Sequence, residues 1–270
     1  DGPGAIALTG GDLGARLDGR PVDPWQSVGV LPGAELSFAG PRDGLRAYLG
    51  VAGGIAVPLV LESRSTLLHA RLGGYMGRAL ESGDRVPVGP DAAAAGHAGW
   101  RLPPECVPVY GHSHTLRVVM GPQDDAFTED GIRTFFSERY ALDPRSDRVG
   151  CRLNGPPIAH RRGADIVSDG TAFGSVQVSG DGLPIVLMAD RGTTGGYAKI
   201  ATVVTADLPR LAQAAPGDRV RFVRVELHEA LALLRAARTD LDRIARAEPY
   251  GVPAAGIFEE DSGERFAAPA

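Results

Sequence analysis

The sequence predicts a mainly β protein built from two related domains. Its 37 glycines and 21 prolines are spread between short apolar runs, a pattern typical of many short strands joined by turns. Two segments also recur in the same order, because residues 15–22 resemble residues 151–158 and residues 44–54 resemble residues 182–192. Two β domains side by side would form a cleft at their junction, which is a usual place for a ligand.

The first half is predicted to be a series of short strands. Their apolar runs fall at residues 5–8, 15–17, 25–30, 34–38 and 45–52. Because the first run begins almost at the first residue, we expect this domain to be incomplete at its N-terminus. Further along, Ser65 or Thr66 is predicted to cap a short helix that ends at Gly73-Gly74.

A Pro- and Ala-rich stretch, residues 89–104, is predicted to be an exposed linker. We therefore expect a first domain at 1–95, a second at 105–248 and a polar tail at 249–270. Strands of the second domain are predicted at residues 115–120, 148–153, 165–168, 175–178, 183–189, 200–204 and 219–225.

Three helices are predicted in the second domain. They run from Asp124 or Asp125 to about Arg139, over residues 207–213, and from Glu226 to about Ala247. The last helix carries apolar residues at helical spacing, namely Leu227, Leu231, Leu234, Ala237, Leu241 and Ile244. We expect this stripe to pack against its own barrel rather than to dock a partner.

The composition excludes several classes of partner. A net charge of −5 and a pI near 5.7 provide no basic field for nucleic acid or an anionic membrane. No apolar run approaches the ~18 residues that a spanning helix needs. The two cysteines, Cys106 and Cys151, are expected to be free thiols rather than a disulfide. We therefore expect a cytoplasmic globular protein.

The leading candidate for a site is the Gly-rich loop between the predicted strands 183–189 and 200–204. Its glycines, Gly192, Gly195 and Gly196, permit positive φ angles and let the backbone approach a ligand closely. Consecutive N–H groups of such a turn can form an anion-binding nest.

Side chains of the same loop supply the candidate catalytic residues Lys199, Asp190, Thr193 and Thr194. Lys199 is the only lysine of the chain. Asp190 ends the preceding strand and is the candidate general base or orienting group, and the phenol of Tyr197 is a candidate binding group. A tight β-hairpin with one surface lysine fits the same residues.

Candidate binding residues lie in both halves. The segment 62–66 places Arg64 beside the hydroxyls of Ser65 and Thr66, which suits a carboxylate or phosphate, although a capped helix start fits as well. Arg78 has the same two interpretations. Gln177 alternates with two valines, so its amide points either to solvent or into a polar barrel mouth. We expect Arg64, Arg78 and Gln177 to line the cleft between the halves.

No metal site is predicted. His112 and His114 would share one face of a strand, but the sequence nearby offers no third ligand. The chain also contains no Walker loop, no dinucleotide fingerprint and no G-x-S-x-G elbow.

Five motifs together carry a family resemblance, and they lie at residues 44–54, 63–66, 72–78, 174–177 and 190–197. With them the chain resembles the A/B half of the biotin-dependent carboxyltransferase domain. That family includes the C subunit of 5-oxoprolinase, the KipA proteins and the corresponding domain of urea carboxylase, often labelled allophanate hydrolase subunit 2. The resemblance runs from about Ala5 to Val225, without the family's N-terminal Gln-Asp-x-Gly-Arg motif.

The resemblance implies two cyclophilin-like β-barrels, the first incomplete, and a sibling subunit of C/D type (the B-type, KipI-like partner). It implies a subunit of a bacterial 5-oxoprolinase, in which the assembled complex, with a further A-type subunit, uses ATP to open pyroglutamate to glutamate. A carboxyltransferase acting on urea or a small amide with carboxybiotin is one alternative. A binding protein that, with its sibling, inhibits a sensor histidine kinase is another. Because the chain has no biotin-acceptor motif and no ATP-grasp signature, another chain is expected to supply the ATP or carboxybiotin step.

Overall fold

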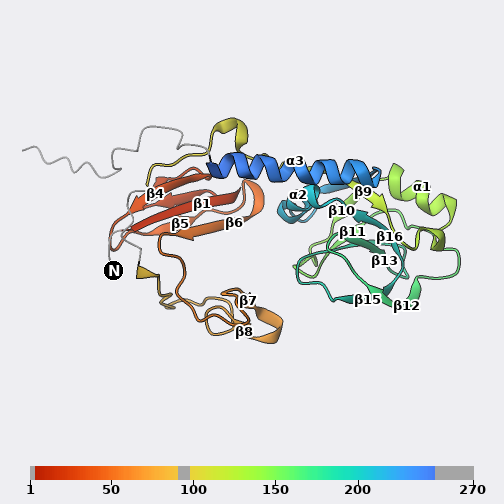
Figure 1. Ribbon diagram of the computed structural model, residues 1–270, viewed down its shortest axis with the longest axis horizontal. Coiled ribbons are helices and arrows are strands. Elements are labelled where there is room, and N and C mark those ends of the chain that lie inside the picture. Colours follow the sequence, from red (N-terminus) through yellow and green to blue (C-terminus); the bar gives the residue numbers. More distant parts are fainter. Residues whose placement is uncertain (1–3, 91–97, 247–270) are drawn as a thin grey trace, which may run out of the picture. The chain divides into compact units, whose positions relative to one another are not determined.

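The protein is described by a computed structural model covering residues 4–90 and 98–246 (Figure 1). Its residues form two compact units. The first contains Asp1–Gly40 and Ala47–Val107, and the second contains Pro41–Arg46 and Pro108–Ala247. The described parts of the predicted linker, residues 89–90 and 98–104, lie inside the first unit, and the predicted tail, 249–270, lies outside the described residues.

The first unit is built from short antiparallel strands around a small core. One sheet has the order β4-β1-β6, with β1 at Gly4–Asp12, β4 at Gln26–Val30 and β6 at Asp43–Val51, and the first residues of β6, up to Arg46, belong to the second unit. The other has the order β3-β2-β5, with β2 at Ala15–Leu17, β3 at Arg20–Pro21 and β5 at Leu36–Phe38. The buried side chains between them are Ile6, Leu8, Ala15, Leu17, Val22 and Val28.

The predicted helix after Thr66 is wrong. The chain there forms a two-stranded hairpin, β7 at Thr66–Leu67 and β8 at Leu72–Gly73, joined by a single 3-10 turn, η1, at Leu68–Ala70. No side chain caps this turn. A segment this short between glycines gains too few hydrogen bonds to offset the cost of starting an α-helix.

The second unit is a closed seven-stranded barrel in the order β10-β11-β14-β13-β16-β9-β17 (Figure 1). The strands are β9 at Ser113–Met120, β10 at Tyr140–Leu142, β11 at Gly150–Asn154, β13 at Ser175–Val178, β14 at Pro184–Leu187, β16 at Lys199–Val203 and β17 at Arg219–Arg224. The pair β9 and β17 is parallel, whereas the other barrel pairs are antiparallel. The prediction of a mainly β protein is confirmed.

A two-stranded ribbon accompanies the barrel. It pairs β12 at Asp165–Gly170 with β15 at Thr194–Tyr197 (Figure 1). The predicted glycine loop therefore contains a strand, and the ribbon, rather than a free loop, positions its side chains.

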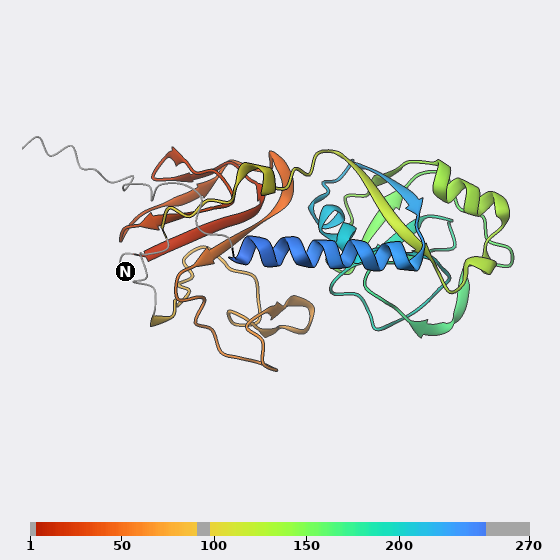
Figure 2. The same ribbon diagram turned by 45° about the horizontal axis from the view of Figure 1, so that its top comes forward.

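Helix α1 at Glu129–Ser137 packs beside β17 and is the light-green helix of Figure 2. Its cap is Thr128, whose hydroxyl accepts a hydrogen bond from the N–H of Gly131 at 3.0 Å. Caps at Asp124 or Asp125 were predicted, but those residues form a separate 3-10 turn, η5, at Asp124–Ala126. The remaining short helices are η4 at Pro104–Cys106, η6 at Thr205–Asp207 and α2 at Leu208–Gln213.

Helix α3 spans Leu227–Arg246 and contacts its own unit at η6 and β9. The apolar stripe, which was expected to pack against the barrel, is buried only in part, because Leu234, Ala237 and Ile244 are half-buried and the other three members are exposed. Leu227, Leu231 and Leu241 are 61%, 42% and 66% exposed. The two cysteines are free, as predicted, and burial raises the pKa of the Cys151 thiol to about 11.

Candidate functional site

The ribbon of β12 and β15 covers a polar cluster on the outer face of the barrel. In β13, Val176 and Val178 belong to the core, so the alternation of a strand turns Gln177 to the opposite face. Gln177 pairs in register with Lys199 of β16, which places the two side chains on the same face. Both are buried, at 7% and 2% exposure. The alternative of a hairpin with one surface lysine is therefore wrong.

The buried lysine has a carboxylate partner that the sequence analysis did not identify. Lys199 Nζ lies 2.9 Å from Asp169 Oδ2, on a side chain of β12 that is 53% exposed. The hydrogen bond from Lys199 is the main cause that lowers the pKa of Asp169, with help from the Gly170 N–H and the Gln123 amide. Because Asp169 and Lys199 lie 30 residues apart, only the pairing of β12 over the barrel brings them together.

Gln123 connects both members of this ion pair. Its Oε1 accepts a hydrogen bond from the Lys199 backbone N–H at 3.2 Å, and its Nε2 donates to Asp169 Oδ2 at 3.3 Å. Gln123 therefore ties the carboxylate that contacts the ammonium group to the backbone of the strand that carries Lys199. The sequence signal for this residue was weak, because a single glutamine in a turn has no distinguishing pattern.

The glycines of the ribbon allow close packing, and they do not adopt an unusual backbone conformation. Gly192, Gly195 and Gly196 do not have positive φ, so the predicted nest at this loop is wrong. A Cβ on Gly195 would instead lie 2.5 Å from Gln177 Nε2. The Gln177 amide donates to the carbonyl oxygen of Tyr197 at 3.3 Å. Gly195 thus lets the ribbon lie directly on Gln177.

The other predicted catalytic residues have structural partners. Asp190 accepts hydrogen bonds from the Arg148 guanidinium at 2.8 and 2.9 Å. The Thr193 carbonyl accepts from the Thr171 N–H, and Thr194 pairs with Gly170 in the ribbon. No hydrogen bond among the described residues joins Asp190 to Lys199.

The predicted binding residues of the first unit lie in the loops around β7 and β8. Arg64 Nε donates to the Val57 carbonyl oxygen at 3.2 Å. Ser65 donates its N–H to the Ser63 hydroxyl, and Thr66 pairs with Gly73. Gln177 lies in the other unit, so the expected cleft between the halves stays a prediction.

Arg78 is engaged with the protein itself. Its guanidinium donates to both carboxylate oxygens of Asp84 at 2.7 and 2.8 Å. The hydrogen bonds from Arg78 are the main cause that lowers the pKa of Asp84 to about 2. This pair closes the loop that follows Gly77, so the structure assigns Arg78 an anchoring role.

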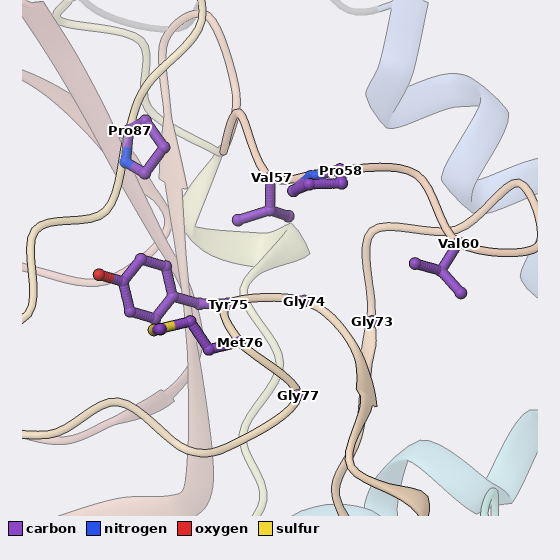
Figure 3. Close-up of a pocket in the computed structure, with 9 residues that line it drawn as sticks. All are labelled: Val57, Pro58, Val60, Gly73, Gly74, Tyr75, Met76, Gly77 and Pro87. Atoms are coloured by element: carbon purple, nitrogen blue, oxygen red, sulfur yellow. The ribbon is translucent and has the colours of Figure 1, made fainter.

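The same region of the first unit contains a cavity of about 400 Å³ (Figure 3). Its walls are Val57, Pro58, Val60, Pro87 and the turn 73–77. In the sequence, only the glycines of the turn 73–77 indicated that this segment is unusual. At Gly73, Gly74 and Gly77 a Cβ would collide with residues 65, 66 and 71.

The paired histidines share one carboxylate partner. His112 Nδ1 and His114 Nε2 lie 2.8 and 3.2 Å from the two oxygens of Asp218. Burial alone would raise the pKa of Asp218, but hydrogen bonds from the Ala215 N–H and both histidines outweigh it, and the pKa lies below its usual value. No group of three metal-binding side chains occurs in the part of the chain that the structure describes.

Comparison with known proteins identifies the class to which the chain belongs. The chain belongs to the family of the carboxyltransferase domain, subdomain A and B, whose model matches residues 1–224. Two relatives are each named as the C subunit of 5-oxoprolinase. The one from Escherichia coli K12 is 37% identical over 240 residues, which cover 89% of this chain and 74% of the relative. The one from Haemophilus influenzae is 36% identical over 241 residues, covering 89% and 76%.

A solved structure supports the same family. The Kluyveromyces lactis urea amidolyase superposes with a TM-score of 0.81 at 28% identity, over 90% of this chain and 16% of that much longer one. No helix within the described ranges is long and apolar enough to cross a membrane.

Proposed function

We propose that this chain is a subunit of a cytoplasmic, ATP-dependent 5-oxoprolinase that opens pyroglutamate to glutamate. The observation that carries the proposal is the similarity to the C subunits of two 5-oxoprolinases along about nine-tenths of the chain. The relative named putative urea carboxylase is 32% identical, but the match covers 20% of its length. The partners under this proposal are a sibling subunit of C/D type and an A-type subunit.

Lys199 is the residue proposed to act on the substrate. When water adds to the carbonyl carbon of a lactam, negative charge develops on the carbonyl oxygen before the C–N bond breaks and the nitrogen leaves as a protonated amine, and a fixed ammonium group stabilises that charge. Lys199 is held by Asp169 and Gln123, so little reorganisation is needed when the charge develops. Gln177 lies on the same face of the barrel beside Lys199.

A carboxyltransferase acting on urea is the second candidate, favoured by the match to urea amidolyase. In that case another chain or domain would carry the biotin, and this chain would contact the carboxyl group during transfer. The same buried ammonium would then stabilise a carboxylate or urea oxygen.

Co-purification of the chain with its sibling subunits, followed by measurement of ATP hydrolysis, separates the two functions. We expect hydrolysis to depend on 5-oxoproline and on every member of the complex, and the isolated chain to be inactive. Hydrolysis that depends on urea and a biotin carboxylase, without a response to 5-oxoproline, would support the second candidate instead.

A further inference from the structure

The ammonium group that is proposed to act on the substrate is covered in this structure. Lys199 is 2% exposed, and Gln177 beside it is 7% exposed. The covering element is the ribbon of β12 and β15, which is a sheet of its own outside the barrel strands (Figure 1). A substrate can contact Lys199 only if this cover is displaced.

Polar side chains attach the ribbon to the rest of the second unit. Asp169 accepts hydrogen bonds from Lys199 Nζ at 2.9 Å and from Gln123 Nε2 at 3.3 Å. The Tyr197 carbonyl oxygen accepts another from Gln177 Nε2 at 3.3 Å. Water can replace each of these partners when the ribbon moves, because all the groups involved are polar.

Apolar attachment of the ribbon is slight. Ile166 packs against the barrel core, but Val167 and Tyr197 are 92% and 39% exposed. Beneath the ribbon lie the polar side chains of Gln177 and Lys199, so lifting it would expose little apolar surface. An element with few buried apolar contacts opens at a lower free energy than the core does.

A bulge in β12 brings Asp169 to Lys199. Asp165 pairs with Tyr197 and Asp169 pairs with Gly195, so residues 166–168 lie opposite Gly196 alone. Regular antiparallel pairing from Asp165 would place residue 167, a valine, opposite Gly195 instead. Bulges redirect side chains in this way. Here the result is a half-exposed ion pair, which water separates more readily than it separates a buried apolar contact.

The two ends of the ribbon differ in burial. At one end the Ala198 N–H donates to the Ala164 carbonyl oxygen at 2.9 Å, and both alanines are buried. At the other end the Thr171 N–H donates to the Thr193 carbonyl oxygen at 3.0 Å, and residues 192–194 are exposed. Because both ends join the two strands, the strands move together, and the exposed end is the one that can leave the barrel.

We infer that the ribbon is a lid over Lys199 and that Asp169 is the latch that holds it closed. The lid opens to admit the substrate and then closes again, which returns Asp169 to the ammonium group. That the opening admits the substrate rests on the proposed function, whereas the opening itself rests on the contacts of the ribbon.

The single lysine makes the opening measurable. The N-hydroxysuccinimide ester of acetic acid acylates accessible amines. Mass spectrometry of the digested full chain gives the rate at Lys199, with Nα-acetyllysine in the same solution as the uncovered reference. We expect Lys199 to react at least about tenfold more slowly than the reference, at a rate that hardly changes with urea below the unfolding transition, because a local opening exposes little surface.

Three results with the wild type would overturn the inference. A rate equal to that of the reference would show that Lys199 is not covered. No reaction below the unfolding transition, or a rate that rises with urea in parallel with global unfolding, would show that the ribbon does not open by itself.

Gly195→Ala tests the lid without changing a charge. Its Cβ would lie 2.5 Å from Gln177 Nε2 and should hold the ribbon away from the barrel, so that Lys199 reacts about fivefold faster or more. Gly196→Ala is the matched control, since its Cβ would meet nothing closer than 3.7 Å, and it should react as the wild type does. Asp169→Asn should also react faster, because the latch is weakened. Faster reaction in Asp169→Asn but not in Gly195→Ala would indicate altered protonation of Lys199 and would contradict the lid.

These outcomes are separable from the proposed function. ATP hydrolysis that depends on 5-oxoproline, together with labelling that follows global unfolding, would leave the function and remove the lid. Labelling by local opening, in a chain whose complex does not respond to 5-oxoproline, would leave the lid and remove the function.

Discussion

Gly195 lies directly against the side-chain amide of Gln177, so that a Cβ on the glycine would fall 2.5 Å from Gln177 Nε2. This contact joins the ribbon to the barrel at the point where Lys199 is covered. The size of the side chain at position 195 therefore determines how closely the ribbon can approach the barrel.

Gly195→Ala should destabilise the protein by about 1–3 kcal/mol, because the added methyl group forces the ribbon or the Gln177 side chain to move. Denaturation with urea measures the difference. Gly196→Ala is the matched control, because a Cβ there would meet nothing closer than 3.7 Å. Equal losses of stability in the two variants would show that the loss of a glycine, rather than the contact with Gln177, causes the destabilisation.

Lys199→Met should lower turnover of 5-oxoproline by the assembled complex about 10²–10³-fold, which is typical for loss of one preorganised charge at a reacting oxygen. The methionine keeps most of the aliphatic stem, so assembly should survive. Gel filtration of the complex checks assembly, and steady-state kinetics measure turnover. Wild-type turnover in a correctly assembled variant would remove Lys199 from the site.

Replacement of the two ion-pair partners should have unequal effects on stability. Asp169→Asn leaves a buried ammonium group without its counter-charge, whereas Lys199→Met leaves a carboxylate that is about half exposed and can be hydrated. Thermal unfolding at neutral pH should therefore show the lower melting temperature for Asp169→Asn. The reverse order would indicate that the side chain of Lys199 is hydrated in solution.

The Arg78–Asp84 pair should make stability depend on pH in acid. Asp84 has a folded-state pKa of about 2, below its ordinary value of 3.8, so its contribution is complete above about pH 4 and is lost as the pH falls toward 2. The difference in urea midpoint between the wild type and Asp84→Asn should shrink over that range. A difference that stays constant between pH 6 and pH 2 would contradict this assignment.

Thr128→Ala should lower the free energy of unfolding by about 1 kcal/mol, because the Gly131 N–H loses the acceptor that caps α1. Asp125→Ala should have little effect, although the sequence favoured an aspartate at 124 or 125 as the cap. Urea unfolding of both variants distinguishes the two positions. A larger loss at Asp125 would place the start of the helix one turn earlier.

Many strands could be predicted from the sequence because they are short apolar runs between turn residues, as residues 175–178 and 219–224 illustrate. The strands β7, β8, β10 and β15 were not predicted. Lys199 also stood out as the only lysine. Its partners could not be predicted, since Asp169 and Gln123 reach it through pairing between distant segments. The sequence indicated correctly that Gly195 is important, but it did not indicate why. The glycine is needed because the ribbon lies close to the barrel, and such a contact between distant strands leaves no local sequence pattern.

The parallel pairing of β9 with β17 brings together the two ends of the second unit's sequence, since Ser113 pairs with Arg219 and Val118 with Arg224. During synthesis the barrel cannot close until the last of these strands has left the ribosome. Contacts of such high sequence separation slow folding and leave β9 as a temporary unpaired edge. The nascent chain should therefore depend on chaperones, or on slow elongation beyond residue 224, to avoid pairing that edge with another molecule.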